Sequence, residues 1–285
     1  MNKLKIAIQK SGRLNEDSLK ILTDCGIYID NGKDQLKAAA RNFPLEVFYL
    51  RNGDIPQYLR DGVVDIAIIG ENVLIEKGEN ITIAEKLGFS KCKVSLAIPK
   101  GAKYNSVKDF EGKRIATSYP ETVKAYLKEK GVNAELHIIN GSVEIAPNIG
   151  LADAICDIVS SGSTLFKNNL KEVEVMLKSE AVLAVSPKIT AESKQLLEKL
   201  QFRIQSVLTA RSSKYILLNA PNDKIEAISK ILPVLKSPTI LPLAEEGWSS
   251  LHSVIKKEDF WEVIDELKKN GAEGILVCPI EKMVL

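Results

Sequence analysis

The sequence is poor in the residues on which most metal and nucleophilic sites depend. Its 285 residues include 4 cysteines and 2 histidines, and no two cysteines form a CxxC pair. Structural zinc sites need clusters of these residues, so a zinc fold is excluded and the cysteines are expected to be buried, reduced thiols. No GxSxG turn is present, and His137 and His252 are isolated, which argues against a serine hydrolase.

Other absences exclude further classes of protein. The chain has no GxxxxGK[ST] loop and no GxGxxG after a strand, so neither common nucleotide-binding motif is present. The 39 basic and 37 acidic residues balance to a net charge of +2, which argues against a nucleic-acid or membrane surface. No uncharged apolar run is long enough to span a bilayer, and MNKLKIAIQK lacks the apolar core of a signal peptide. We expect a cytoplasmic protein.

What the chain does contain is a regular alternation of short apolar strands and helical segments. Such alternation predicts an α/β fold with mostly parallel sheets. The expected helices are 15–25, 54–61, 121–129 and 191–200. The expected strands of this part are 4–9, 45–50, 64–69, 94–99, 114–117, 134–139, 154–159 and 178–187.

A faint internal repeat indicates two similar lobes. KIAIQKSGRL resembles RIATSYPETV, and each is followed by a helix that ends in glycine. Later, GVVD followed by IAIIGENVL mirrors GLAD followed by AICDIVSSGSTL. Two such lobes are typical of proteins that clamp a ligand in a cleft, and the repeat predicts that both glycine turns face that cleft.

The pattern changes beyond Arg211, where strands and helices follow the order βαββαβ. This order predicts a separate ferredoxin-like domain. The expected division is lobe I at 1–93 and 179–211, lobe II at 94–178, and a C-terminal domain at 212–285. The expected elements of the last domain are 214–221, 223–232, 239–243, 251–257, 258–270 and 274–280.

The stretch SVEIAPNIGLADAICDIVSSGSTL, residues 142–165, has the strongest functional signal. A buried strand ends there in a hydroxyl-rich turn at the start of a helix, which suits a phosphate group. Taken alone, the turn is better explained by an ordinary serine or threonine N-cap. Glu144 and Asp157 lie close to it, and two acids suit ribose hydroxyls or magnesium better than phosphate.

Cations and polar groups follow other strands. Lys10-Ser11-Gly12-Arg13 and Arg51 come directly after strands, where ligands of α/β sheets collect, and they suit a polyphosphate. The alternative is a solvated loop in which Asn15 and Asp54 cap the next helices. Gly70-Glu71 would contribute polar groups to the cleft, and Tyr119 would either stack on a base or pack beneath its turn.

These motifs together resemble the ATP phosphoribosyltransferase family, in its long form with an extra C-terminal domain. The resemblance extends over essentially the whole chain. It rests on IAIQKSGRL, DGVVDIAIIGENVL, GKRIATSYP, GSVEIAP, GLADAICDIVSSG, SPTILPLA and PIEKM.

The resemblance implies two periplasmic-binding-protein-like lobes and the first reaction of histidine biosynthesis, with Mg²⁺ as cofactor through the substrate phosphates. It also implies feedback inhibition by histidine and homodimers that assemble to hexamers. For phosphoribosyl pyrophosphate it points to Glu144, Asp157, Ser160, Ser161, Gly162, Ser163 and Thr164. For ATP we combine it with the cation pattern and assign Lys10, Ser11, Gly12, Arg13, Gly70, Glu71 and Tyr119. The residues expected to act in catalysis are Lys10, Arg13, Arg51, Glu144 and Asp157. The histidine site would involve Asn219, Leu235, Thr239, Val254 and Gly274.

A non-catalytic solute-binding protein is the alternative, because it shares the two-lobed architecture. It would be expected to carry a signal peptide and no ferredoxin-like domain, and the sequence fits neither expectation. A ligand-sensing transcription regulator would need a helix-turn-helix and a basic surface, which are not visible.

Overall fold

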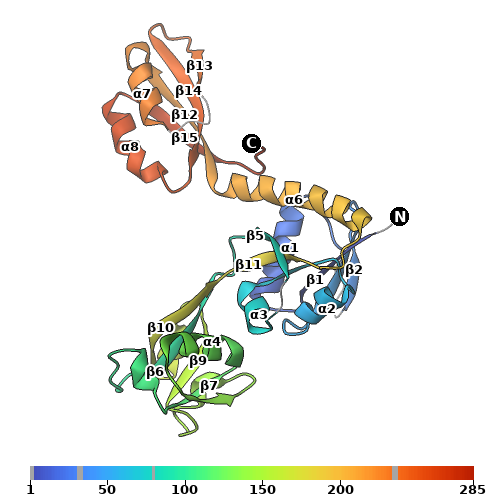
Figure 1. The fold of residues 1–285 in the computed structure, drawn as a ribbon. Helices are drawn as coiled ribbons and strands as arrows, with labels where there is room; N and C mark the ends of the chain where they lie inside the picture. The colour runs from blue at the N-terminus through green and yellow to red at the C-terminus, as the bar shows by residue number, and fades with distance from the viewer. Residues whose placement is uncertain (1–2, 31–34, 79–80, 233–236) are drawn as a thin grey trace. The chain divides into compact units, whose positions relative to one another are not determined.

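The computed structural model describes residues 3–30, 35–78, 81–232 and 237–285. It divides into two compact units, Met1–Thr23 with Ile27–Leu197, and Asp24–Gly26 with Glu198–Leu285. The first unit contains two sheets and the second contains one (Figure 1). Among the described residues, no helix has both the length and the apolar character needed to cross a membrane.

Lobe I is the part of the first unit built on a six-stranded sheet of order β2-β3-β1-β4-β11-β5. Its strands are β1 (Leu4–Gln9), β2 (Lys37–Ala39), β3 (Leu45–Leu50), β4 (Ile66–Gly70), β5 (Thr82–Lys86) and β11 (Ala181–Val185). Its helices are α1 (Arg13–Asp24), α2 (Ile55–Asp61) and α3 (Glu71–Glu76). Four consecutive apolar residues of β4 are fully buried, as expected for a central strand covered on both faces.

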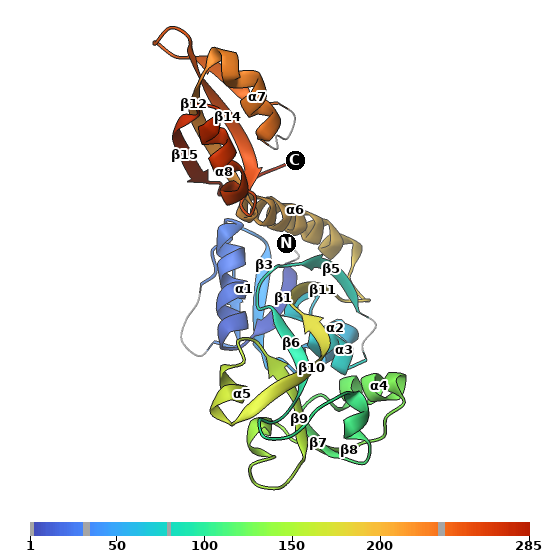
Figure 2. The same cartoon turned by 90° about the vertical axis from the view of Figure 1, so that its left-hand side faces the viewer.

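Lobe II is built on a five-stranded sheet of order β10-β6-β9-β7-β8 (Figure 2). Its strands are β6 (Cys92–Pro99), β7 (Arg114–Thr117), β8 (Glu135–Ile138), β9 (Ala154–Val159) and β10 (Leu170–Ser179). Its helical segments are η1 (Val107–Phe110), α4 (Pro120–Lys130), η2 (Val143–Ile145) and α5 (Ser163–Lys167). Two buried apolar clusters pack in this lobe, one including Leu96 and Ile115 and the other including Ala116 and Ile155.

The prediction of mostly parallel sheets was wrong. Only the β1–β3, β1–β4, β7–β8 and β7–β9 pairs are parallel, and the other pairs of these two sheets are antiparallel. For β5, β6, β10 and β11 the cause is the connection between the lobes, which the chain crosses twice in opposite directions, whereas β2 and β3 are consecutive antiparallel strands within lobe I. The two crossings bond to each other, with the Leu87 N–H donating to Ala181 O at 2.9 Å and the Ala181 N–H donating to Phe89 O at 3.0 Å. Strand 178–187 of the prediction is in fact the end of β10 followed by β11.

The internal repeat is confirmed at the level of single hydrogen bonds. In lobe I, Asp65 of the GVVD segment accepts from the Lys5 N–H at 2.8 Å and returns its own N–H to Lys5 O at 2.9 Å. In lobe II, Asp153 of GLAD makes the same two bonds with the backbone of Arg114, both at 2.9 Å. In both lobes, therefore, a G-x-x-D segment fixes the register of two parallel strands.

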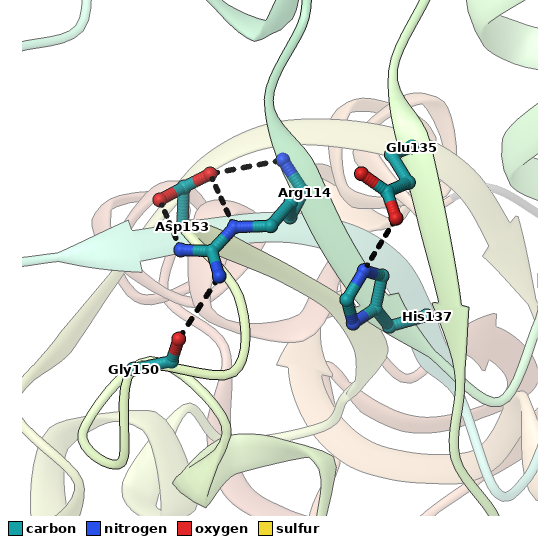
Figure 3. A network of polar contacts seen from close by, with 5 residues as sticks. All are labelled: Arg114, Glu135, His137, Gly150 and Asp153. Atoms are coloured by element: carbon teal, nitrogen blue, oxygen red, sulfur yellow. Dashed lines mark hydrogen bonds and ion pairs between the residues drawn. The ribbon is translucent and has the colours of Figure 1, made fainter.

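Lobe II adds a side-chain ion pair to this arrangement (Figure 3). The Arg114 guanidinium contacts Asp153 Oδ1 at 3.0 Å and also donates to Gly150 O at 3.0 Å. His137 lies on the neighbouring strand β8, and its Nε2 is 3.0 Å from Glu135 Oε1. This surface contact agrees with the interpretation of His137 as a non-catalytic residue.

The second unit contains a four-stranded antiparallel sheet of order β13-β14-β12-β15. Its elements are β12 (Ser213–Pro221), η3 (Asn222–Lys224), α7 (Ile225–Ile231), β13 (Thr239–Pro242), β14 (Trp248–Lys256), α8 (Phe260–Lys269) and β15 (Glu273–Pro279). The predicted βαββαβ order and ferredoxin-like arrangement are confirmed. Ile228 of α7 and Leu267 of α8 pack on Ile216 and Leu251, so both helices cover one face of the sheet (Figure 1).

Helix α6 (Ala191–Arg211) is longer than predicted, since the expected end was residue 200. Buried Leu200, Ile204 and Val207 continue the three- and four-residue spacing of one helix face. The helix was therefore readable from the sequence pattern.

Candidate functional site

The hydroxyl-rich turn of lobe II lies beside a cavity of about 260 Å³. The chain leaves buried strand β9, turns at Gly162 with a φ of 75°, and enters α5 at Ser163. This left-handed φ favours glycine because a Cβ would be strained there. Ser161 Oγ and Ser163 Oγ lie 3.0 Å apart, so neighbouring hydroxyls are held together at the rim.

All seven residues predicted for the sugar substrate line this one cavity. They are Glu144, Asp157, Ser160, Ser161, Gly162, Ser163 and Thr164. Glu144 lies up to twenty residues before the others in the sequence. It reaches the same cavity because η2, which carries Glu144, packs against β9. Gly162 occupies the N-cap position of α5, and the Ser161 hydroxyl, one residue earlier, accepts the Ser163 N–H at 3.5 Å.

The two acids of the cavity carry uncompensated negative charge. Burial raises the pKa of Asp157, and the nearby Glu144 carboxylate raises this pKa further. The Ile158 N–H opposes this shift by donating to Asp157 Oδ1 at 2.7 Å. No cation pairs with either carboxylate among the described residues. Such a pair suits sugar hydroxyls or a magnesium ion shared with substrate phosphates.

The described residues contain no group of three or more potential metal ligands. A metal held by protein side chains alone therefore has no cluster to bind in this part of the chain. The two carboxylates fit a magnesium ion whose remaining ligands are phosphate oxygens and water.

Two predicted cations, Lys10 and Arg51, follow neighbouring strands at the sheet edge of lobe I. The Lys10 N–H donates to Leu50 O at 2.8 Å, which places Lys10 next to Arg51. Neither side chain has an ion-pair partner among the described residues. Arg13 differs, since its Nε lies 3.9 Å from Asp17 Oδ2 in the first turns of α1. These three cations do not line the cavity of the lobe II turn.

The structure corrects two helix starts near these cations. Helix α1 begins at Arg13, so Asn15 lies inside the helix, where its amide donates to Gln9 O at 2.7 Å. Asp54 does occupy the N-cap position of α2, but its side chain makes no capping bond. Asn52, which the sequence argument did not single out, has a shielded Oδ1 without a hydrogen-bond partner in the described chain. A buried acceptor of this kind favours a ligand that donates.

The Gly70 turn faces the same region as the lobe II turn, as the repeat predicted. Glu71 and Ser160 line one further cavity. A Cβ on Gly70 would lie 2.5 Å from Asn72 Oδ1, so a larger residue there would force the Asn72 side chain to move. Asn72 is buried and makes two hydrogen bonds with Ser179, each of 3.0 Å. The Asn72 backbone N–H donates to Ser179 Oγ, and the Ser179 hydroxyl donates to Asn72 Oδ1.

Tyr119 packs against the core of lobe II, in agreement with the packing interpretation of this ring. Its hydroxyl accepts from Asn72 Nδ2 at 3.5 Å, so it links the two lobes. Burial, and next the charge of Asp157, raise the pKa of Tyr119, so the hydroxyl stays protonated.

A second link between the lobes was not foreseen. Glu76 of α3 accepts from the backbone N–H of Glu121 at 3.0 Å and of Thr122 at 2.9 Å, and from the Thr122 hydroxyl at 2.7 Å. It thereby caps α4, whose own N-cap residue Tyr119 offers no capping bond. The only sequence signal was the missing cap on α4, because the partner lies 45 residues away.

The expected histidine-site residues share one sheet of the second unit. Asn219 and Val254 are next to the core residues Leu218 and Ile255 on their strands. Thr239 pairs with His252, which is next to the core residue Leu251. All three therefore lie on the face opposite the two helices. A Cβ on Gly274, which has a φ of 58°, would lie 3.3 Å from Asn219 Nδ2. Leu235 lies outside the described residues.

Comparison with known families agrees with this architecture. The family model described as ATP phosphoribosyltransferase matches residues 51–206, and the model for the C-terminal domain of that family matches residues 210–282. A relative named ATP phosphoribosyltransferase from Cytophaga hutchinsonii is 55% identical over 99% of this chain and 98% of its own length. One of the same name from Bacteroides thetaiotaomicron is 54% identical over 99% of this chain and all of its own.

Solved structures support the same assignment. A chain of the ATP phosphoribosyl transferase (HisG:HisZ) complex from Thermotoga maritima aligns with a TM-score of 0.63 and 31% identity, over 73% of this chain and 99% of that one. The substrate binding protein of an amino acid ABC transporter aligns over 74% of this chain and 95% of its own, with a TM-score of 0.50 and 14% identity. At 14% identity the latter likeness shows a shared two-lobed fold alone, and it lends no support to the alternative of a non-catalytic binding protein. The chain belongs to the ATP phosphoribosyltransferase family and is therefore an enzyme of the pentosyltransferase class.

Proposed function

We propose that this chain condenses ATP and 5-phosphoribosyl 1-pyrophosphate to N1-(5-phosphoribosyl)-ATP and pyrophosphate, the first step of histidine biosynthesis. One observation carries the proposal beyond family membership. Every residue expected to hold the sugar substrate, from Glu144 to Thr164, lines the same cavity.

In this proposal the turn at 160–164 binds the 5-phosphate through its hydroxyls and backbone N–H groups. Asp157 and Glu144 accept hydrogen bonds from the ribose hydroxyls, directly or beside magnesium. Lys10, Arg13 and Arg51 offset phosphate charge at the edge of lobe I, and Ser11, Gly12, Gly70, Glu71 and Tyr119 complete the ATP side. Domain boundaries at 93/94, 178/179 and 211/212 belong to the same proposal.

The reaction is a displacement at the anomeric carbon. The lone pair of adenine N1 forms the new C–N bond while the C–O bond to pyrophosphate breaks, and pyrophosphate leaves with that electron pair. Attack from the opposite face inverts the configuration. Adenine N1 carries no proton in neutral ATP, so neither a strong general base nor a protein nucleophile is needed. The protein contributes alignment of the two substrates and stabilisation of the charges that develop.

Magnesium, when bound with the substrate, would neutralise pyrophosphate oxygens and so improve the leaving group. Among this chain's residues, Asp157 and Glu144 fit that ion best because they are carboxylates at the rim of the cavity.

The C-terminal sheet is proposed to bind histidine as a feedback inhibitor, near Asn219, Thr239, Val254 and Gly274. A homodimer that assembles to a hexamer is proposed for the oligomeric state, and the cytoplasm for the location. Asn219→Ala and Thr239→Ala should weaken inhibition by histidine and leave uninhibited turnover unchanged. Inhibition curves that match the wild type would contradict this histidine site.

The overall reaction is tested with purified full-length chain, ATP, phosphoribosyl pyrophosphate and Mg²⁺. The product is followed by its absorbance and by release of pyrophosphate. Product that depends on both substrates is expected, and failure to form it would overturn the proposed function.

A further inference from the structure

A second cavity, of about 460 Å³, adjoins the cavity of the lobe II turn. The two cavities share Val159 and Ser160. Four lysines line the second cavity, together with the two carboxylates Glu71 and Glu180. The lysines are Lys86, Lys91, Lys93 and Lys178. The wall therefore carries an excess of two positive charges next to the proposed 5-phosphate site.

Two of these lysines are directly opposite each other in a β-ladder. Lys178 of β10 pairs with Lys93 of β6, and Lys93 pairs on its other side with Val159 of β9. Like charges at paired positions are unfavourable, because their side chains emerge from the same face about 5 Å apart. The row Lys178–Lys93–Val159 ends one residue before Ser160. An anion bound between the two lysines would relieve their repulsion. Because the row ends at Val159, that anion would lie close to the turn that begins at Ser160.

The charges of the cavity are only partly compensated within the protein. Lys93 Nζ lies 2.6 Å from Glu172 Oε2, and Lys86 Nζ lies 3.4 Å from Glu71 Oε2. Lys91 and Lys178 have no ion-pair partner among the described residues. Glu180 is already engaged, since its Oε2 accepts the Gly88 N–H at 2.9 Å. An anion with several oxygens could contact more than one of these cations at once.

The reaction itself calls for a second cationic site. Both substrates carry a polyphosphate chain, a triphosphate on ATP and a diphosphate on the sugar. At the edge of lobe I, the Lys10 N–H bonds to Leu50 O, so Lys10 and Arg51 follow neighbouring strands. Lysine ammonium groups are compact point charges that bind phosphate well, and binding clefts with one sign of charge attract such ligands.

We propose that Lys93 and Lys178, assisted by Lys86, form a polyphosphate subsite that binds the phosphate chain of one substrate beside the lobe II turn. This inference rests on the proposed function for the identity of the substrates. The shared chemistry is a chain of two or three phosphates. Its source, the sugar diphosphate or the ATP triphosphate, is distinguished by the test.

The test uses the full-length chain and the variants Lys93→Gln, Lys178→Gln and Lys93→Arg. Lys199→Gln is the matched control, because Lys199 is an exposed lysine on α6 that lines neither cavity. Calorimetry measures binding of inorganic pyrophosphate and tripolyphosphate, and steady-state kinetics measures KM for each substrate.

Lys93→Gln and Lys178→Gln should each weaken binding of these anions by about tenfold or more, as expected for loss of a charged hydrogen bond. Lys93→Arg should restore most of the affinity, and Lys199→Gln should leave it unchanged. A rise of KM confined to phosphoribosyl pyrophosphate assigns the sugar diphosphate to the subsite, and a rise confined to ATP assigns the triphosphate.

Wild-type affinity for both anions in Lys93→Gln and Lys178→Gln would overturn the subsite. Thermal unfolding distinguishes loss of the subsite from misfolding of the variant. Lys178→Gln should not lower the transition temperature, because the substitution removes a cross-strand repulsion. Failure of the proposed function can be distinguished from failure of the subsite. If the proposed function is wrong, the wild type forms no product, whereas anion binding is measured without turnover.

Discussion

The two lobes of the first unit use the same scaffold to present different chemistry. In each, an aspartate of a G-x-x-D segment is bonded to the backbone of a parallel neighbour, Lys5 in lobe I and Arg114 in lobe II. At the strand ends they diverge. Lobe I presents Lys10 and Arg51, whereas lobe II presents hydroxyls together with Glu144 and Asp157. The repeated part stabilises each lobe, and the part that differs determines what each lobe can bind.

The largest effect on activity is expected from changing Asp157, an acid of the lobe II cavity that has no counterpart at the equivalent position of lobe I. Asp157→Asn should lower kcat/KM for the sugar substrate by about a hundredfold or more, the usual cost of removing a preorganised charge. Stability should move in the opposite direction. Burial raises the folded-state pKa of Asp157 above its unfolded value, so ionising it destabilises the fold as pH rises through that interval.

At neutral pH, Asp157→Asn should therefore unfold at an equal or higher denaturant concentration than the wild type. Steady-state kinetics and urea unfolding measure the two quantities. An unfolded or destabilised variant would mean that the carboxylate has a structural role, and wild-type kinetics would remove it from the site.

A large structural effect is expected at the corresponding turn of lobe I. Gly70→Ala would place a Cβ 2.5 Å from Asn72 Oδ1, whose side chain is held by Ser179. We expect the free energy of unfolding to fall by about 1–3 kcal/mol, as for other overpacked positions. Gly162→Ala is the comparison in lobe II, since no atom of the described residues lies within 4 Å of its added Cβ and the change meets backbone strain instead. Equal stability of Gly70→Ala and the wild type would disprove the steric argument.

A smaller effect is expected where the lobes are linked. Glu76→Ala removes the acceptors for the first backbone N–H groups of α4, which should cost about 1 kcal/mol of unfolding free energy. Amide hydrogen exchange at Glu121 and Thr122 should become faster. Glu129→Ala is the control, because Glu129 lies at the other end of α4 and its ion-pair partner among the described residues is Lys130. Unchanged exchange in Glu76→Ala would show that the cap does not form in solution.

The smallest effect on stability is expected from the aspartates of the two G-x-x-D segments, Asp153 and Asp65. Asp153→Asn should cost about 1 kcal/mol or less, because its ion pair with Arg114 is solvent-exposed. Arg114 lowers the pKa of Asp153, so this stabilisation is present above the unfolded-state pKa of about 3.9 and is lost as the pH falls through the folded-state value.

Asp65→Asn in lobe I is the counterpart, since the Asp65 carboxylate bonds to the Lys5 backbone N–H. Its effect should depend less on salt than that of Asp153→Asn. Thermal unfolding at low and high salt tests this difference. Identical salt dependence would mean that the Arg114 pair contributes nothing.

Much of the fold was readable from local patterns. Strands β1, β3, β7 and β9 were predicted with the bounds that the structure has, because each is a short, largely apolar segment with several buried residues, followed by a turn. The direction of the outer strands was not readable. Strand β10 carries polar residues along much of its length, and its pairing with β6 depends on how the chain returns between the lobes.

Part of the candidate site was also predictable from local sequence, and part was not. Residues 157–164 are contiguous, so one strand and its turn present most of the polar groups of the lobe II cavity. The lysine pair of β6 and β10 and the cap by Glu76 join residues 85 and 45 positions apart. No periodicity connects such residues.

By itself, the sequence determined the α/β class, the repeated lobes, the ferredoxin-like sheet and the hydroxyl turn with its two acids. These depend on short-range spacing and on turn chemistry, which act within a few residues. Only the tertiary structure decided that Lys93 pairs with Lys178 and that Glu76 caps a helix of the other lobe. Those contacts arise from strand order and packing, and they form only when distant segments of the chain are brought together by burial of their apolar faces.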